Sequence, residues 1–158
     1  MTKFEKISLF LLRISTGWIM FYAGITKVLD PNWSATGYLM NAKTFPQFFA
    51  WFASPNILPI TNFLNEWGLT ILGLSLIFGV FVRFTSLAGV ALMLLYYFPV
   101  LEFPIIAPHS YIIDEHIIYA FILLYFAATK AGRVYGLENW CSQLPICSRF
   151  PKLRNWLG

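Results

Sequence analysis

Charge is the property that this sequence lacks most. Only 11% of its 158 residues are charged, whereas soluble domains carry about 25% charged residues. Hydrophobic residues account for 58% of the chain, and the mean hydropathy is +0.66. So few charges cannot cover the surface of a soluble domain. The composition therefore predicts an integral membrane protein, and the length suffices for one domain and hardly more.

The chain also lacks the sequence patterns of several function classes. It has no glycine-rich phosphate loop, no zinc-ligand cluster, no haem, flavin or iron–sulfur pattern and no solenoid repeat. Its net charge of +4 comes from basic residues in short loops and tails, so it does not indicate nucleic-acid binding. The two cysteines, Cys141 and Cys147, have no known redox or metal spacing, and in a cytoplasmic tail we expect reduced thiols. We predict no metal and no haem.

Four apolar segments are long enough, or nearly so, to cross a bilayer. They cover about residues 7–26, 64–81, 84–100 and 116–128. The last reaches full length only if residues 111–115 lie in the helix or at the interface. Together they predict an all-α four-helix bundle over residues 1–140, followed by a basic amphiphilic tail, 141–158. Arg13 interrupts the apolar core that a cleaved signal peptide needs, so we expect the first span to be retained.

The distribution of lysine and arginine predicts the orientation, because short cytoplasmic loops carry an excess of these residues. With the N-terminus inside, the inner segments hold eight of them and the outer segments two. The inner set is Lys3, Lys6, Arg83, Lys130, Arg133, Arg149, Lys152 and Arg154, and the outer pair is Lys27 and Lys43. We therefore predict a multi-pass protein of a bacterial or archaeal cytoplasmic (inner) membrane, with both termini cytoplasmic.

Residues 34–52 are aromatic but too polar to span the membrane, and Pro46 interrupts them. They predict an interfacial or re-entrant helical segment on the outer face, between the first two spans, which caps the bundle. A plain aromatic belt is an equally good interpretation. Asn62 or Asn65 is expected to cap the second span, which would put Glu66 in its first turn.

The first span carries a positive charge at two heights, at Arg13 and Lys27. At about 100° per residue, Gly17, Gly24 and Lys27 fall within roughly 40° of Arg13 on the helix. An arginine inside an apolar helix costs a few kcal/mol unless it faces protein or water. This face should therefore point at the other helices. The partner of Arg13 could be a carboxylate, backbone carbonyls or a bound anion, and the spacing does not distinguish them.

Polar residues gather at the predicted outer end of the bundle. They are Lys27, Glu66, Asp114, Glu115 and His116, with Tyr119 one turn beyond His116. Each also has a purely structural interpretation: Glu66 can stabilise a helix N-terminus, Asp114 can cap one, and Lys27 can extend to the interface.

As a site, this cluster predicts a pocket that opens outward, with Lys27 at its mouth and Arg13 at its floor. Such a pocket suits a small oxyanion, or a quinone head group whose carbonyl oxygens need a proton donor. Histidine beside a carboxylate can supply protons on reduction.

Several stretches, in order, resemble the DoxX/DoxD membrane family over roughly residues 7–140. They are Leu12-Arg-Ile-x-x-Gly-Trp-Ile-Met-Phe-x-x-Gly-x-x-Lys27, Trp33-Ser-Ala-x-Gly-Tyr-Leu, Glu66-Trp-Gly-Leu-x-Ile-Leu-Gly-Leu-x-Leu-x-x-Gly-x-x-x-Arg83, Asp114-Glu-His-Ile-Ile-Tyr-Ala and Ala131-Gly-Arg-x-x-Gly-Leu. DoxD-like proteins are the membrane subunit of thiosulfate:quinone oxidoreductase, which oxidises thiosulfate to tetrathionate and reduces quinone.

The resemblance implies quinone as co-substrate and a DoxA-like partner subunit. It implies Arg13, Glu66 and His116 as catalytic residues and Lys27 as a substrate-binding residue. We add Asp114 and Tyr119 as substrate-binding candidates because they flank His116.

A non-catalytic membrane subunit or assembly factor that binds lipid, quinone or a partner protein is the alternative function. A small-solute transporter is less expected, because four spans make a narrow bundle. We expect membrane lipid as a partner, homo-oligomers as an option, and no nucleic acid.

Overall fold

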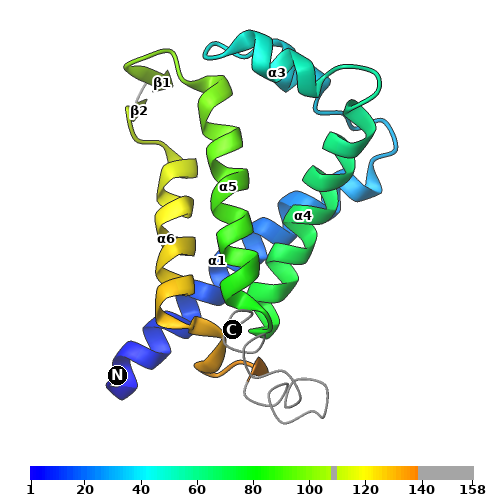
Figure 1. The fold of residues 1–158 in the computed structure, drawn as a ribbon. Helices are drawn as coiled ribbons and strands as arrows, with labels where there is room; N and C mark the ends of the chain where they lie inside the picture. Colours follow the sequence, from blue (N-terminus) through cyan, green and yellow to red (C-terminus); the bar gives the residue numbers. More distant parts are fainter. Residues whose placement is uncertain (108–109, 139–158) are drawn as a thin grey trace.

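The computed structural model describes residues 1–107 and 110–138, and within them the chain is mostly helical. The predicted tail with Cys141 and Cys147 lies outside the described residues. The long helices are α1 (Lys3–Leu29), α4 (Leu58–Phe78), α5 (Val82–Val100) and α6 (Glu115–Thr129). The short elements are α2 (Thr36–Met40), α3 (Pro46–Phe52), the 3-10 turn η1 (Ala131–Arg133), and the strands β1 (Ile105–Ala107) and β2 (Ser110–Tyr111). In Figure 1, α4, α5 and α6 run along the long direction of the molecule, and α1 crosses them obliquely.

Two helices, α1 and α5, are long and apolar enough to cross a membrane, and α6 is apolar but shorter. Helix α4 is 21 residues long and carries Asn62, Asn65 and Glu66 in its first half. The predicted apolar segments therefore overlap the four long helices. Among the described residues, α1 and α5 meet the length and hydropathy needed to cross a membrane, whereas α4 and α6 do not.

Glycine residues let α1 and α4 approach backbone to backbone. A Cβ atom added at Gly73 would lie 2.2 Å from the Phe21 backbone nitrogen, and one added at Gly24 would lie 2.4 Å from that of Thr70. Small residues allow this kind of close helix contact. Arg13 and Gly17 are also buried, so the prediction that this face of the first helix turns toward the rest of the protein is confirmed.

The predicted start of α4 is wrong by more than a turn. The helix begins at Leu58 after Ile57, which makes no side-chain capping bond, and Pro59 lies in its first turn. Proline suits this position because its missing N–H would be unpaired there anyway. Neither Asn62 nor Asn65 therefore caps the helix, and Glu66 lies more than two turns inside it.

Residues 34–52, called the cap segment from here on, fold into α2 and α3 rather than one continuous helix. Phe45 separates the two helices with a left-handed backbone, and Pro46 starts α3. The segment covers the end of the molecule where α4 begins and α5 ends (Figure 1). We call this end the cap end. Leu39, Ala42 and Phe49 form a small buried core of its own.

The prediction of an all-α chain misses one detail. Strands β1 and β2 pair antiparallel after α5. They have three and two residues, which is too short to show the alternation that identifies a strand in a sequence.

Candidate functional site

A cavity of ≈ 270 Å³ lies at the cap end, between α4, α5 and the cap segment. Helices α4 and α5 diverge toward this end, and α3 bridges them (Figure 1). The lining residues are Lys27, Trp33, Ser34, Ala35, Tyr38, Leu39, Phe49, Phe52, Thr61, Leu64, Asn65, Leu92, Leu95 and Tyr96. Most of these side chains are apolar or aromatic, so the few polar groups among them determine what the cavity can bind.

The Lys27 ammonium group forms the polar centre of the cavity wall. Its Nζ donates hydrogen bonds to Asn65 Oδ1 at 2.8 Å and to Tyr96 Oη at 2.7 Å. The Tyr96 hydroxyl in turn donates to Asn65 Oδ1 at 2.5 Å. Three helices thus meet in one polar triangle, because α1 supplies the lysine, α4 the asparagine and α5 the tyrosine.

Aromatic rings surround the same ammonium group. Lys27 Nζ lies 4.9 Å from the centre of the Trp33 ring and 5.0 Å from that of the Tyr96 ring. Cation–π contacts of this kind stabilise a charge that is partly removed from water. An ammonium group has three N–H donors, and two of them bond Asn65 and Tyr96. The third remains for a ligand in the cavity.

His116 and Asp114 lie behind Tyr96, one layer away from the cavity. The His116 ring stacks on the Tyr96 ring, with centroids 5.5 Å apart and planes at 25°. His116 Nδ1 lies 2.6 Å from Asp114 Oδ2. The other carboxylate oxygen, Oδ1, accepts the backbone N–H groups of His116 and Ile117. Asp114 is therefore the N-cap of α6, as one of the two interpretations predicted, and it also orients the histidine ring.

Tyr38 fastens the cap segment to α5. Its hydroxyl donates a hydrogen bond to the backbone carbonyl oxygen of Tyr96. Burial, with a smaller contribution from the Asp114 charge, raises the pKa of Tyr38 to about 12. The hydroxyl therefore stays protonated and keeps this donor over the whole physiological pH range.

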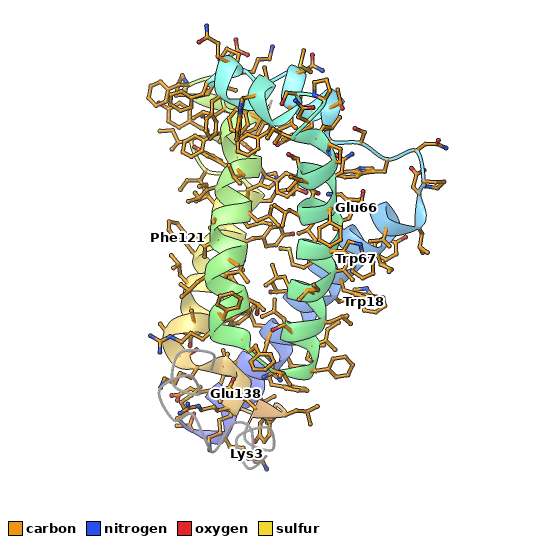
Figure 2. All side chains as sticks on the ribbon, turned by 45° about the vertical axis from the view of Figure 1, so that its right-hand side comes forward. Lys3, Trp18, Glu66, Trp67, Phe121 and Glu138 are labelled. Carbon is orange, nitrogen blue, oxygen red and sulfur yellow. The ribbon has the colours of Figure 1, made fainter. Side chains whose placement is uncertain are left out.

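Glu66 and Tyr119 are not among the described residues that line the cavity. Figure 2 shows Glu66 above Trp67 on α4, toward the cap end, whereas Lys3 and Glu138 lie at the opposite end. The Glu66 carboxylate acts electrostatically on Lys27. Tyr119 lies one turn along α6 from His116 and packs partly buried against the main apolar core.

Arg13 is not part of this site, and the expectation that it forms the floor of the pocket is wrong. Its side chain is fully buried. Nη1 donates to the carbonyl oxygen of Ala131 at 2.7 Å, and Nη2 donates to that of Tyr135 at 3.2 Å. The 14 positions between Arg13 and Lys27 correspond to about 21 Å along a helix. Of the three partners left open, backbone carbonyls accept its hydrogen bonds, and the Glu138 carboxylate acts on it electrostatically.

Glycines make room for the guanidinium group. Gly79 ends α4 with φ +69°, a conformation that favours glycine, and a Cβ atom there would lie 2.5 Å from Arg13 Nη1. A Cβ atom at Gly136 would lie 2.7 Å from the same nitrogen. Nearby, Arg133 Nε donates to Glu138 Oε1 at 3.1 Å, and burial raises the pKa of Glu138 despite this ion pair.

A family model described as DoxX matches residues 8–101 of the chain. The chain belongs to the DoxX family. DoxX is a membrane family, so this is a membrane protein with apolar helices. Searches of the curated proteins and of the solved structures give no significant match. The matched range contains Lys27, Asn65 and Tyr96, and it ends before Asp114 and His116.

Most of the residues that line the cavity of this DoxX protein were not predicted as site residues, and four of them surround the Lys27 ammonium group or fasten the cap segment. These four are Trp33, Tyr38, Asn65 and Tyr96. Asn65 had been interpreted as a helix cap and Tyr96 as part of an aromatic rim. A usable signal was present, because Lys27, Asn65 and Tyr96 each lie within two turns of the same end of an apolar helix. Polar groups at one depth in different spans are candidates for mutual contact.

The described part of this DoxX protein offers no evident metal site. Among residues 1–107 and 110–138, no three His, Cys, Asp or Glu side chains are grouped to hold a metal ion. The groups that could hold an organic ligand are the Lys27 ammonium, the Asn65 amide and the Tyr96 hydroxyl.

Proposed function

We propose that this chain is the membrane subunit of a quinone-linked oxidoreductase and that its cavity holds the quinone head group. The observation that carries the proposal is the Lys27 ammonium group in the wall of a mostly apolar cavity, where the described residues accept hydrogen bonds from two of its three N–H donors. A quinone ring is apolar, and its carbonyl oxygens accept hydrogen bonds. It therefore matches both kinds of surface that the cavity presents.

A small hydrated oxyanion suits this cavity less well. Moving an anion from water into apolar surroundings costs several kcal/mol or more unless its oxygens are hydrogen-bonded. Thiosulfate has several such oxygens, whereas the cavity supplies one ammonium group and few other donors. We therefore assign the cavity to the quinone, and we place thiosulfate oxidation at an interface with a DoxA-like partner subunit.

The proposed reaction takes one electron from each of two thiosulfate ions, which join through a new S–S bond to form tetrathionate, and gives the two electrons with two protons to the quinone, which becomes the quinol. Lys27 would donate a hydrogen bond to one carbonyl oxygen and stabilise the negative charge that reduction places on it. The Tyr96 hydroxyl in the cavity wall and the His116–Asp114 pair behind the Tyr96 ring would supply the protons. Glu66 would add a favourable charge next to Lys27.

We also propose that α1, α4, α5 and α6 all cross a bacterial or archaeal cytoplasmic membrane as a four-helix bundle. The N-terminus and the turn between α4 and α5 lie at the end opposite α3 (Figure 1). That end carries Lys3, Lys6, Arg83, Lys130 and Arg133, whereas the cap end carries Lys27 and Lys43. This bias favours a cytoplasmic N-terminus, which makes the cap end the outer end.

The test is a direct assay of the purified chain, alone and together with a partner encoded by a neighbouring gene. We expect extractable quinone in the preparation and thiosulfate-dependent quinone reduction with the partner. No bound quinone and no turnover in either preparation would overturn the proposal. Bound quinone without turnover would support the alternative, a non-catalytic quinone-binding subunit.

A further inference from the structure

We infer that the quinone enters the cavity sideways from the lipid, between α4 and α5, and that Leu64 and Leu95 form the walls of this passage and hold the first part of the isoprenoid tail. The inference rests on the proposed function, since it describes how the same ligand reaches the same cavity. It adds the route, the tail-binding residues and a requirement that the ligand be an amphiphile rather than a water-soluble compound.

Hydrogen bonds tie the cap segment to both diverging helices at the cap end. The Ala35 backbone N–H donates to Asn62 Oδ1 on α4 at 3.1 Å. On the α5 side, the Lys43 backbone N–H donates to the Pro99 carbonyl at 2.8 Å, and Thr44 Oγ1 donates to the Leu101 carbonyl at 2.6 Å. Entry from this end would require several of these bonds to break together with the one from Tyr38 to Tyr96.

The wall that α4 and α5 contribute contains leucine side chains, which can move aside without breaking hydrogen bonds of this kind. Leu64 and Leu95 both line the cavity, and 60% and 41% of their surfaces are exposed. Lining side chains with this much exposed surface lie where the cavity meets its surroundings. Leucine has no polar atoms to bond, and its rotamers exchange within nanoseconds when it is exposed.

The depth of the two leucines fits a lipid-facing passage. Leu64 lies six positions inside the start of α4 and Leu95 five positions before the end of α5, or about 9 Å and 8 Å from the helix ends. In a membrane this places both below the polar surface, among the acyl chains. The ring could then rest against Lys27 while the tail stays in lipid.

The experiment compares two benzoquinones with identical rings, one without a tail and one with a long isoprenoid tail. Leu64→Trp and Leu95→Trp are measured in lipid nanodiscs against Leu74→Trp, a control at another exposed leucine on α4 that does not line the cavity. We expect the first two to slow association of the tailed quinone about tenfold, with little change for the tail-less one. The control should leave both rates unchanged.

A tryptophan at either position could also fill the cavity and block binding directly. Leu64→Ala and Leu95→Ala avoid this problem because they remove side-chain volume. Both alanine variants should speed association of the tailed quinone, because they widen the passage. Unchanged association rates in the alanine variants, or equal effects on both quinones, would overturn the lateral route. If the unsubstituted protein binds neither quinone, the proposed function fails instead, so the two failures are distinguishable.

Discussion

Arg13 Nη1 donates a 2.7 Å hydrogen bond to the carbonyl oxygen of Ala131, 118 positions later in the chain. This bond joins the middle of α1 to the turn that follows α6. A second bond reaches Tyr135, and Gly79 and Gly136 leave the space that the guanidinium group occupies. Arg13 is therefore a structural tie between the first and last parts of the described fold, at the end far from the cavity.

Arg13→Ala should destabilise the protein and leave quinone affinity unchanged. Each hydrogen bond from a charged group contributes about 1.5–3 kcal/mol, so losing two should lower the free energy of unfolding by about 3 kcal/mol or more. For a chain of this size, that corresponds to a Tm about 10 °C lower, which thermal unfolding in detergent would measure.

Lys6→Ala, at an exposed position on the same helix, is the matched control and should leave the Tm close to that of the unsubstituted protein. Quinone affinity is measured well below the Tm of each variant. If Arg13→Ala lowered the quinone affinity without lowering the stability, Arg13 would be a ligand-binding residue and not a structural one.

Arg13 also shows what the sequence can and cannot predict. A charge in the middle of an apolar helix has to be buried against protein, and both its burial and the packing of the glycine face on another helix were predictable on that ground. Its acceptors were not, because backbone carbonyl oxygens are present at every residue and carry no sequence signal. Only the folded turn at Ala131 distinguishes one carbonyl from another.

The cavity illustrates a second limit. The place of Lys27 in the cavity wall was predictable because its charge lies at the end of an apolar helix. Its partners Asn65 and Tyr96 depend on how α1, α4 and α5 are arranged in space, which residue spacing within one helix does not determine. The predicted start of α4 was also wrong. Because Asn65 was expected to cap this helix, it was not predicted to bond Lys27 and Tyr96.

Lys27→Met should weaken quinone binding without unfolding the protein. Methionine keeps most of the chain length but removes the N–H donor and the charge. Losing one hydrogen bond from a charged group costs about 1.5–3 kcal/mol, which is about a 10- to 150-fold rise in Kd. Quenching of tryptophan fluorescence on quinone addition gives the measurement, since Trp33 lines the cavity.

Lys43→Met removes a lysine from the same end of the molecule and is the control. Its side chain is exposed, and Lys43 does not line the cavity. Equal affinities for the Lys27 and Lys43 variants would show that the ammonium group does not contact the ligand.

Gly73→Ala should separate α1 from α4. The added Cβ atom would lie 2.2 Å from the Phe21 backbone nitrogen, so one helix has to shift, and overpacking of this kind costs about 1–3 kcal/mol. Gly68→Ala in the same helix is the control, because its Cβ atom would meet only Leu92 Cδ2, at 4.0 Å. The intrinsic helix preference of alanine should make that variant equally or more stable. Thermal unfolding that ranks the two variants the other way would contradict the close packing.

Asp114→Ala and Asp114→Asn separate the two roles of this carboxylate. Asparagine caps a helix about as well as aspartate, whereas alanine loses about 1 kcal/mol of helix stability. Only the alanine variant should therefore show a lower Tm. Both variants remove the carboxylate partner of His116, so both should slow thiosulfate-dependent quinone reduction, by about 100-fold if the pair supplies protons. Normal turnover in the asparagine variant would show that Asp114 caps the helix and takes no part in proton transfer.

Glu138→Gln should change how stability depends on pH. Burial raises the pKa of Glu138 in the folded state above its unfolded value of about 4.3. The folded state then binds the proton more tightly, so the contribution of Glu138 to stability is fully present below the unfolded pKa and is lost as the pH rises through the folded pKa. Glutamine cannot titrate, but its side-chain oxygen can still accept the hydrogen bond from Arg133. The Tm of the unsubstituted protein should therefore fall relative to that of Glu138→Gln as the pH is raised from about 4. A rise over the same range would mean that the ion pair with Arg133 outweighs burial.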